Sequence, residues 1–289
     1  MRAAVLGPVC RDLTTIDGLQ TLHIGGIPYY VALALRNLGE SDVTAYVTAS
    51  EADSEWVKAC LSGVEVKHIP VEKTLESILE YSSKNPDVRT HHIDAYPNTI
   101  LPTGELIAEL ENFDYVIFGP LFHDNIPLEF FTRLKHKNLV LGNFGMFTYG
   151  EKGEFVRKSP ENIVQVLPFL RYLFLDRSEA EFVSGKTDLH EVGKFFRERG
   201  LQNMIVTEGS KGSHLFIGGE YYKIPAFTPE RIVDPTGAGD TYLAAFIRAT
   251  ELFTNPGQQG RFAAVVATMS LEKVGAFAEG LGDVLKRLK

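Results

Sequence analysis

The stretch RIVDPTGAGDTYLAAFI, residues 231 to 247, sets a glycine-rich turn directly before an apolar segment with helical spacing. The letters RIV are typical of the end of a strand, and the apolar spacing after Gly239 predicts a helix. One face of that helix carries Leu243, Phe246, Ile247 and Thr250. The pattern therefore predicts a strand, then a TGAG turn, then a helix that begins at the turn.

A helix that begins at such a turn favours an anion. Its first backbone N–H groups lack partners within the helix, and the aligned peptide dipoles leave partial positive charge there. The small residues Gly237, Ala238 and Gly239 let the backbone approach a ligand closely and direct successive N–H groups toward it. The turn is thus predicted to be an anion hole.

Asp240 follows this turn and needs a separate explanation, because a fixed carboxylate repels the phosphate that an anion hole attracts. A role as proton acceptor resolves the conflict: the carboxylate takes or orients the proton of a hydroxyl that attacks a phosphoryl group. In the alternative interpretation, Asp240 only caps the helix, which aspartate often does. The position in the sequence leaves both interpretations open.

Other glycine patterns are weaker. Neither GxGxxG nor GxxxxGK[ST] occurs, so the dinucleotide fingerprint and the P-loop are both missing from the sequence. The segment TEGSKGS, residues 207 to 213, follows a predicted strand and could bring backbone close to a nucleotide. A plain turn between two strands explains that segment equally well.

The rest of the chain alternates between buried strands and helices. Six short apolar runs predict strands that are buried on both faces: residues 3–7, 43–48, 115–120, 138–143, 172–176 and 204–209. Helices are predicted over 28–39, with Pro28 in its first turn and Gly39 at its end, and over 187–200. Such an alternation predicts an α/β fold with a mostly parallel sheet and helices on both faces.

Two regions break this rhythm. Residues 9–24 and about 76–94 contain alternating strands without helices between them, which predicts a small separate sheet that covers one edge of the main domain as a lid. An ordinary hairpin insertion is the alternative. No linker or repeat divides the chain, so we expect one domain over residues 1–289.

Composition excludes several classes of protein. The net charge is −8, and acidic and basic residues are interleaved, so there is no basic stripe for a nucleic acid. The sequence contains no apolar run of about 18 residues, so it predicts no membrane span. The first residues turn polar too soon for a signal peptide, and we expect a cytoplasmic protein. The only two cysteines, Cys10 and Cys60, predict neither a disulfide framework nor a zinc site. Cys10 could line a site, but we favour a packing role for it.

The string DPTGAGD, residues 234 to 240, resembles the signature of the PfkB family of carbohydrate kinases, which have the ribokinase-like fold. Four more segments occur in the family's order: GPVCRD, GGIPYYVALALRNLG, LDRSEAEFVSG and VTEGSKGSHLF. The resemblance implies a three-layer α/β domain with a small β lid. It also implies an enzyme that transfers the γ-phosphoryl group of ATP, with Mg²⁺, to a hydroxyl of a small sugar or polyol.

The resemblance also assigns roles to residues by position. Asp240 is then the base for the acceptor hydroxyl, beside the anion hole of Gly237, Ala238 and Gly239. The acceptor is contacted by Asp12, Gly25 and Gly26, and Tyr30 stands in the same motif. The nucleotide is bordered by Thr207, Gly209, Gly212 and the helix that contains RFAAVVATMS.

Further positions match the family's cation sites. Glu179 would act through water around the magnesium ion, and Asp176 stands where the family usually has asparagine. This aspartate adds a negative charge near the metal, which could change the preference for metal or donor. Asp234 and Thr236 occupy places where some members hold a monovalent cation, such as potassium.

The acceptor class is left open by the sequence. Ile27, Tyr29 and Tyr30 make the predicted acceptor pocket less rich in amides than a furanose site. Aromatic walls stack on apolar ring faces and could suit a cyclitol such as inositol, a pyranose or a nucleoside base. A nucleoside kinase of the same fold and a non-catalytic sugar sensor are the alternatives. Exposed lid strands could also pair two copies into a homodimer.

Overall fold

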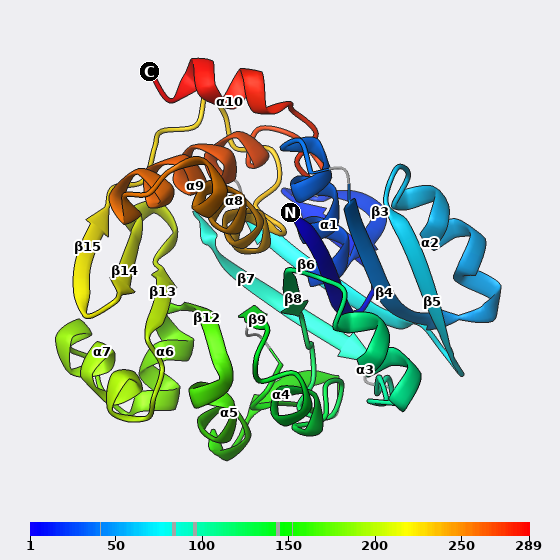
Figure 1. Cartoon of the computed structure of the whole chain (residues 1–289). Coiled ribbons are helices and arrows are strands. Elements are labelled where there is room, and N and C mark those ends of the chain that lie inside the picture. Colours follow the sequence, from blue (N-terminus) through cyan, green and yellow to red (C-terminus); the bar gives the residue numbers. More distant parts are fainter. Residues whose placement is uncertain (41, 83–84, 95–96, 143–144, 152) are drawn as a thin grey trace.

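Two sheets organise the chain in the computed structural model (Figure 1). The structure describes residues 1–40, 42–82, 85–94, 97–142, 145–151 and 153–289, and of residues 81–82, 85–91 and 94 it describes only the backbone. The main sheet has nine strands in the order β15-β14-β13-β12-β9-β8-β1-β4-β5. In chain order these are β1 (Arg2–Pro8), β4 (Asp42–Ser50), β5 (Glu65–Val71), β8 (Tyr115–Phe118), β9 (Asn138–Gly142), β12 (Leu170–Asp176), β13 (Asn203–Thr207), β14 (Ser213–Ile217) and β15 (Glu220–Ile224). Neighbours from β13 to β5 are parallel, whereas β14 and β15 are antiparallel additions at one edge.

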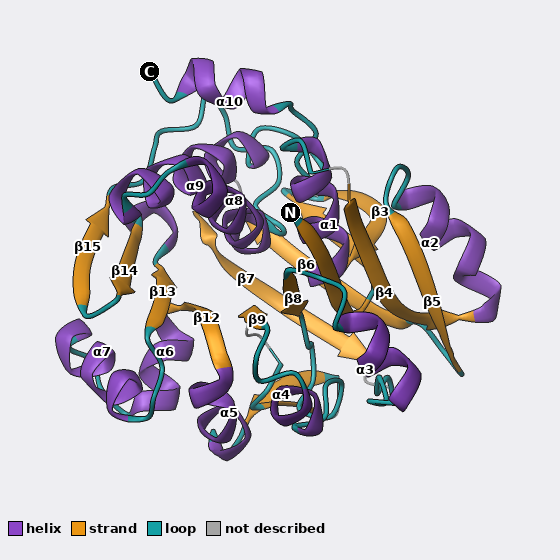
Figure 2. Cartoon of the chain, viewed as in Figure 1, coloured by secondary structure: helices purple, strands orange, loops and turns teal. Residues whose placement is uncertain are grey.

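Helices cover both faces of this sheet, which gives three layers (Figure 2). One face is covered by α1 (Ile27–Asn37), α2 (Ser54–Cys60), α8 (Ala238–Leu252), α9 (Pro256–Ser270) and α10 (Leu281–Arg287). The other is covered by α3 (Gly104–Leu110), α4 (Glu129–Arg133), α5 (Glu161–Val166), α6 (Arg177–Ser184) and α7 (Leu189–Glu198). In β1, Ala3 and Val5 join the first core while Ala4 and Leu6 join the second, as the two-residue period of a strand requires.

The second sheet, here called the lid sheet, has six strands in the order β10-β11-β7-β6-β2-β3. They are β2 (Cys10–Ile16), β3 (Leu19–Gly25), β6 (Leu75–Ser82), β7 (Asn85–Asp94), β10 (Thr148–Glu151) and β11 (Glu154–Arg157). The two stretches that break the helical rhythm of the sequence supply four of these strands. The hairpin of β10 and β11 was not predicted, because four-residue strands are too short to show an alternating pattern.

The local predictions from the sequence have clear outcomes. All six predicted buried strands are present, as β1, β4, β8, β9, β12 and β13, and both predicted helices are present, as α1 and α7. The prediction that RIV, residues 231 to 233, ends a strand is wrong, because this segment is irregular. The N–H groups of Val233 and Asp234 instead donate to the carbonyl of Leu271, just after α9, at 2.7 and 3.2 Å.

Short 3₁₀ turns complete the described elements: η1 (Glu51–Asp53), η2 (Leu167–Phe169) and η3 (Gly209–Lys211). None of the helices in the described part of the chain combines the length and apolar character that crossing a membrane requires.

Candidate active site

The glycine-rich turn leads directly into α8, and its shape depends on Gly237. This residue is the N-cap of the helix in the left-handed conformation, with φ at 73°. A Cβ atom added at this position would lie 2.3 Å from Cδ1 of Tyr30, so both the conformation and the space require glycine. The Oδ1 atom of Asp234 accepts a hydrogen bond from the backbone N–H of Thr236 at 2.9 Å and shapes the start of the turn. We call residues 236–239 the anion loop.

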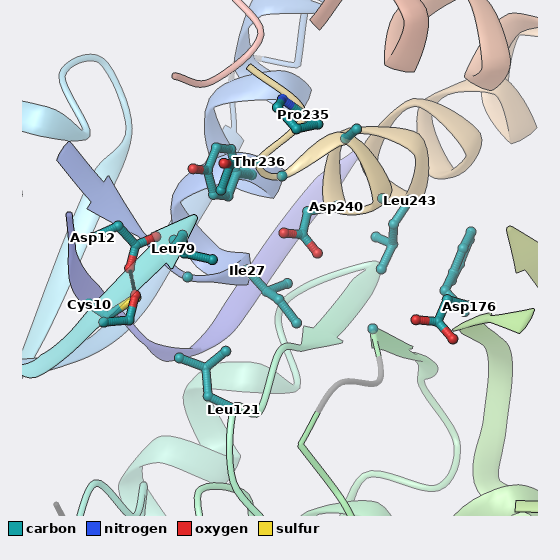
Figure 3. A pocket seen from close by; sticks show the side chains of 18 of the residues that line it. Cys10, Asp12, Ile27, Leu79, Leu121, Asp176, Pro235, Thr236, Asp240 and Leu243 are labelled. Atoms are coloured by element: carbon teal, nitrogen blue, oxygen red, sulfur yellow. Dashed lines mark hydrogen bonds between the residues drawn. The ribbon is translucent and has the colours of Figure 1, made fainter. Parts of the chain in front are cut away.

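Asp240 lies just beyond this loop as the third residue of α8. The N-cap position belongs to Gly237, so Asp240 is not the N-cap residue of this helix. Figure 3 shows its carboxylate between the Cys10 and Asp12 pair on one side and Asp176 on the other. Asp240 is therefore placed to meet groups that enter from either side.

A cavity of about 220 Å³, here called the lid cavity, lies between the lid sheet and the anion loop. From the lid sheet it is lined by Cys10, Asp12, Ser77, Leu79, Ile93 and Phe155. From the main domain it is lined by Tyr30, Asp176, Glu179, Thr207, Asp240 and the anion loop, among others. Since Asp176 and Thr207 end β12 and β13, the cavity lies at the carboxyl edge of the parallel strands, where open α/β sheets bind ligands.

The polar group on the lid side of this cavity is the carboxylate of Asp12, which is buried. Its Oδ1 atom accepts hydrogen bonds from Cys10 Sγ at 2.7 Å and from Ser77 Oγ at 2.5 Å. A Cβ atom on Gly25 would lie 1.8 Å from Asp12 Oδ2, so a glycine is needed beside the carboxylate. Burial, and then the Asp12 charge, raise the pKa of Cys10 well above its ordinary range, and the thiol keeps its proton.

Tyr30 is buried and lines the lid cavity. Its ring packs against Gly237, and its hydroxyl is buried with no hydrogen-bond partner among the described residues. Burial, followed by the nearby Asp12 charge, raises the pKa of Tyr30 well above its ordinary value, so the hydroxyl stays protonated. Tyr30 thus contributes an aromatic wall to the cavity.

Asp176 and Glu179, on the main-domain side of the lid cavity, lie at the start of α6. Asp176 Oδ1 accepts from the Glu179 N–H at 2.7 Å, and Glu179 Oε2 accepts from the Asp176 N–H at 2.8 Å, which is a capping box. Glu179 is buried, although its pattern in the sequence would fit a surface helix residue. Both residues line the lid cavity, and hard carboxylate oxygens suit Mg²⁺, which is bound in such sites by one or two carboxylates, water and substrate phosphates.

A second cavity of about 460 Å³, here called the loop cavity, lies on the other side of the anion loop. It is lined by Thr207 at the end of β13 and by Gly209 and Gly212 from the turn between β13 and β14. Its walls are largely apolar and include Phe227, Ile232, Tyr242, Ala264, Ala267 and Leu271. Both cavities are lined by Thr207, Pro235, Ala238 and Gly239, so they meet at the N-terminus of α8.

His214 on β14 contacts Glu208 in the turn that borders the loop cavity. One ring nitrogen of this buried histidine lies 3.2 Å from Glu208 Oε2 and the other lies 2.8 Å from the Tyr221 hydroxyl. Lys211 Nζ donates to the other Glu208 oxygen at 3.1 Å. Burial lowers the pKa of His214 despite the opposing effect of Glu208.

The structure brings most of the predicted site residues together. Gly26, Asp12, Tyr30, Asp176, Glu179, Thr236 and Asp240 all line the lid cavity, while Gly209 and Gly212 line the loop cavity. Gly25 and Asp234 line neither cavity, and each supports a neighbour instead. The packing role favoured for Cys10 is incomplete, because its thiol also lines the lid cavity and donates to Asp12. Ser77 was missed, since only the pairing of β2 with β6 brings it to Asp12.

Comparison with known proteins decides the family. The family model described as pfkB family carbohydrate kinase matches residues 20–279, which is most of the chain. The chain belongs to this family. It is a PfkB-family kinase of the sugar or nucleoside class, and its fold is the ribokinase-like fold.

One curated protein and two solved structures illustrate the similarity of this chain to known kinases. The chain is 29% identical over 142 residues to a nucleoside kinase from Methanocaldococcus jannaschii, a match that covers 49% of this chain and only 46% of that protein. It is similar, with a TM-score of 0.81 and 21% identity, to a pyrophosphate-dependent kinase of the ribokinase family complexed with a pyrophosphate analogue and myo-inositol, over 99% of both chains. Arabidopsis thaliana ribokinase complexed with ribose and ATP matches with a TM-score of 0.78 and 21% identity, over 100% of this chain and 98% of that one.

Proposed function

We propose that this PfkB-family kinase transfers the γ-phosphoryl group of ATP to a hydroxyl of a small sugar or sugar-like polyol, with Asp240 as the base. The observation that carries this proposal is the meeting of two cavities at one helix N-terminus, with Asp240 beside the junction. Each cavity holds one substrate in this account, and the anion loop lies between them. Phosphoryl transfer needs such positioning more than it needs covalent chemistry by the protein.

Each group then has a defined task. Asp12 accepts hydrogen bonds from acceptor hydroxyls, Asp240 orients and deprotonates the attacking hydroxyl, and the anion loop stabilises charge on the transferred group. Asp176 and Glu179 would hold Mg²⁺, with Glu179 acting through water. When bound, this ion neutralises charge on the donor phosphates.

The loop cavity favours a nucleotide donor over pyrophosphate. Pyrophosphate has no ring to bury, whereas an adenine ring needs an apolar slot. The slot is present between α9 and the segment after β15, with Ala264, Ala267 and Phe227 on its walls. Its volume of about 460 Å³ is in the range of small-molecule pockets. ATP is accordingly our proposed donor, although a structural neighbour is a pyrophosphate-dependent kinase.

A nucleoside is the second candidate acceptor, because one side of the lid cavity is apolar. Ile93, Leu121 and Phe155 line it and offer a surface on which a nucleobase or the apolar face of a cyclitol could lie. Asp12 serves a ribose, a hexose or an inositol equally. A non-catalytic sensor is less consistent with the site, since a sensor has no use for a carboxylate beside an anion hole.

Three smaller proposals accompany this function. Potassium would bind beside Asp234 and Thr236, which are both buried at the anion loop, and its removal would lower kcat.

Leu22 and Ile78 are exposed on the lid sheet opposite the same residue, Leu13, so this apolar face would pair two lids in a homodimer. The supply of ATP fits a cytoplasmic enzyme.

A panel assay tests the proposed function. The purified protein is incubated with Mg²⁺, with ATP or pyrophosphate as donor, and with ribose, fructose, myo-inositol or cytidine as acceptor. Release of ADP and the mass of the product are followed. We expect one class of acceptor to be phosphorylated from ATP. Phosphorylation from pyrophosphate alone would reject the donor, and acceptor binding without turnover would favour a sensor.

A further inference from the structure

The Asp12 carboxylate is held by two donors that converge on one oxygen atom. Cys10 Sγ donates to Oδ1 at 2.7 Å, and Ser77 Oγ donates to the same Oδ1 at 2.5 Å. All three side chains are buried, with 4% or less of their surface exposed. We call these three residues the Asp12 clamp.

The clamp is built from the strand pattern and the sheet register. Cys10 and Asp12 are two residues apart on β2, so their side chains lie on the same face of the lid sheet. Asp12 is paired with Ser77 in the parallel register of β2 and β6, which places the serine beside it on that face. The missing side chain of Gly25 gives Oδ2 its space. The carboxylate is therefore bounded from three strands.

The two donors suit a fixed carboxylate. A hydrogen bond to an ionised acceptor is stronger than one between neutral groups, so even a weak thiol donor adds to the orientation of Asp12. The Cys10 thiol keeps its proton, because burial and the Asp12 charge disfavour the thiolate. Its sulfur is hence a hydrogen-bond donor here and no nucleophile.

We propose that Cys10 is a positioning residue for acceptor binding: together with Ser77 it fixes Asp12 in the orientation in which the carboxylate accepts hydrogen bonds from acceptor hydroxyls. The inference rests on the proposed function, because it takes Asp12 as a ligand of the acceptor. It implies that the lid sheet reads the acceptor, whereas Asp240 on α8 activates it from the main domain.

Other ionisable residues surround the clamp, and the same residues are present in every variant that is compared. His23 on β3 is paired with Asp12, Tyr30 packs on the anion-loop side, and Asp240 lies across the cavity. None of these is changed in the variants below, so a change in the titration of Asp12 reports the loss of its donors.

The test compares four single variants of the full chain and the double variant that combines Cys10→Ala with Ser77→Ala. Cys10→Ala removes the thiol donor, Cys10→Ser restores a donor, and Ser77→Ala removes the second donor. Cys60→Ser is the matched control, because Cys60 is the other cysteine and lines neither cavity. The assay uses whichever of ribose, myo-inositol and cytidine is phosphorylated fastest. The titration of the Asp12 carboxyl is followed by NMR in the same proteins, without any substrate.

We expect Cys10→Ala to raise the acceptor KM about fivefold and Ser77→Ala to raise it about tenfold, with the KM for ATP unchanged. Cys10→Ser should stay within about twofold of the wild type, and the double alanine variant should show less than the product of the two effects. Loss of either donor should move the Asp12 titration to higher pH, since both donors favour the charged form.

Two results would overturn the inference: an unchanged Asp12 titration in Cys10→Ala together with an unchanged acceptor KM, or equal losses in every kinetic constant. If the wild-type protein transfers no phosphoryl group, the proposed function fails. The NMR titration then still decides whether Cys10 and Ser77 hold Asp12.

Discussion

The two sides of the lid cavity are built in different ways. The anion loop and Asp240 come from five consecutive residues at the start of one helix, 236–240, and their geometry is set by Gly237. The Asp12 clamp brings together two strands of the lid sheet, and its members lie up to 67 positions apart, since Cys10 and Ser77 are numbered 10 and 77. In the proposed function, transfer chemistry is therefore local in the chain, whereas acceptor recognition depends on sheet pairing.

This difference predicts unequal effects of substitution. Changes at the anion loop or at Asp240 should reduce the rate of transfer and leave binding nearly intact. Changes elsewhere should alter binding or stability and leave the chemistry intact.

The largest effect is expected at Asp240. Asp240→Asn keeps the size of the side chain and removes the base, so kcat should fall by a factor of about 10² to 10⁴. The KM values for both substrates should change only a few-fold. Steady-state kinetics measures all three constants, and turnover near the wild-type rate would remove Asp240 from the mechanism.

The next effect is expected at Gly237. Gly237→Ala puts a Cβ atom 2.3 Å from Tyr30 Cδ1 at a positive φ, so the anion loop must shift and kcat should fall by about 10². Gly282→Ala, on α10 and outside both cavities, is the control, because a Cβ atom there meets nothing within 4 Å. If both variants lose the same activity, the shape of the loop at Gly237 is not what supports transfer.

A smaller effect is expected in the loop cavity. Ala267→Phe fills this cavity and should raise the KM for ATP about tenfold, because the adenine ring loses its apolar slot. The acceptor KM should stay constant. Ala278→Phe, at an exposed alanine outside both cavities, controls for the added ring. An unchanged ATP KM in Ala267→Phe would place the adenine elsewhere.

The smallest effect concerns His214 and stability. Its pKa is lowered in the fold, so as pH falls below the ordinary histidine value of about 6.5 the unfolded chain takes up a proton that the folded chain does not. Stability therefore declines with falling pH until the folded-state pKa is passed, by less than about 1.4 kcal/mol per pH unit.

His214→Gln removes this contribution. Urea unfolding at pH 7 and at pH 5.5 should show a smaller acid loss of stability in this variant than in the wild type. His136→Gln, at an exposed histidine, serves as the control. An identical acid loss in His214→Gln and the wild type would contradict the assignment.

The same contrast explains what the sequence could predict. The anion loop, the buried strands and α1 and α7 depend on residues close in the chain, and their patterns are visible directly. Ser77 beside Asp12, and the walls of the loop cavity from α9, depend on packing between distant segments. The irregular course of residues 231–233 also follows from a distant partner, the carbonyl of Leu271. No local pattern reports such contacts.

We infer that the two cavities are the two halves of one transfer site. A single-turnover experiment tests it most directly, with the enzyme in excess over ATP that is labelled in its γ-phosphate, in rapid quench with and without the preferred acceptor. We expect the label to move to the acceptor in one phase and to stay in ATP when the acceptor is omitted. Label that reaches water at the same rate in both reactions, or that never leaves ATP, would contradict it.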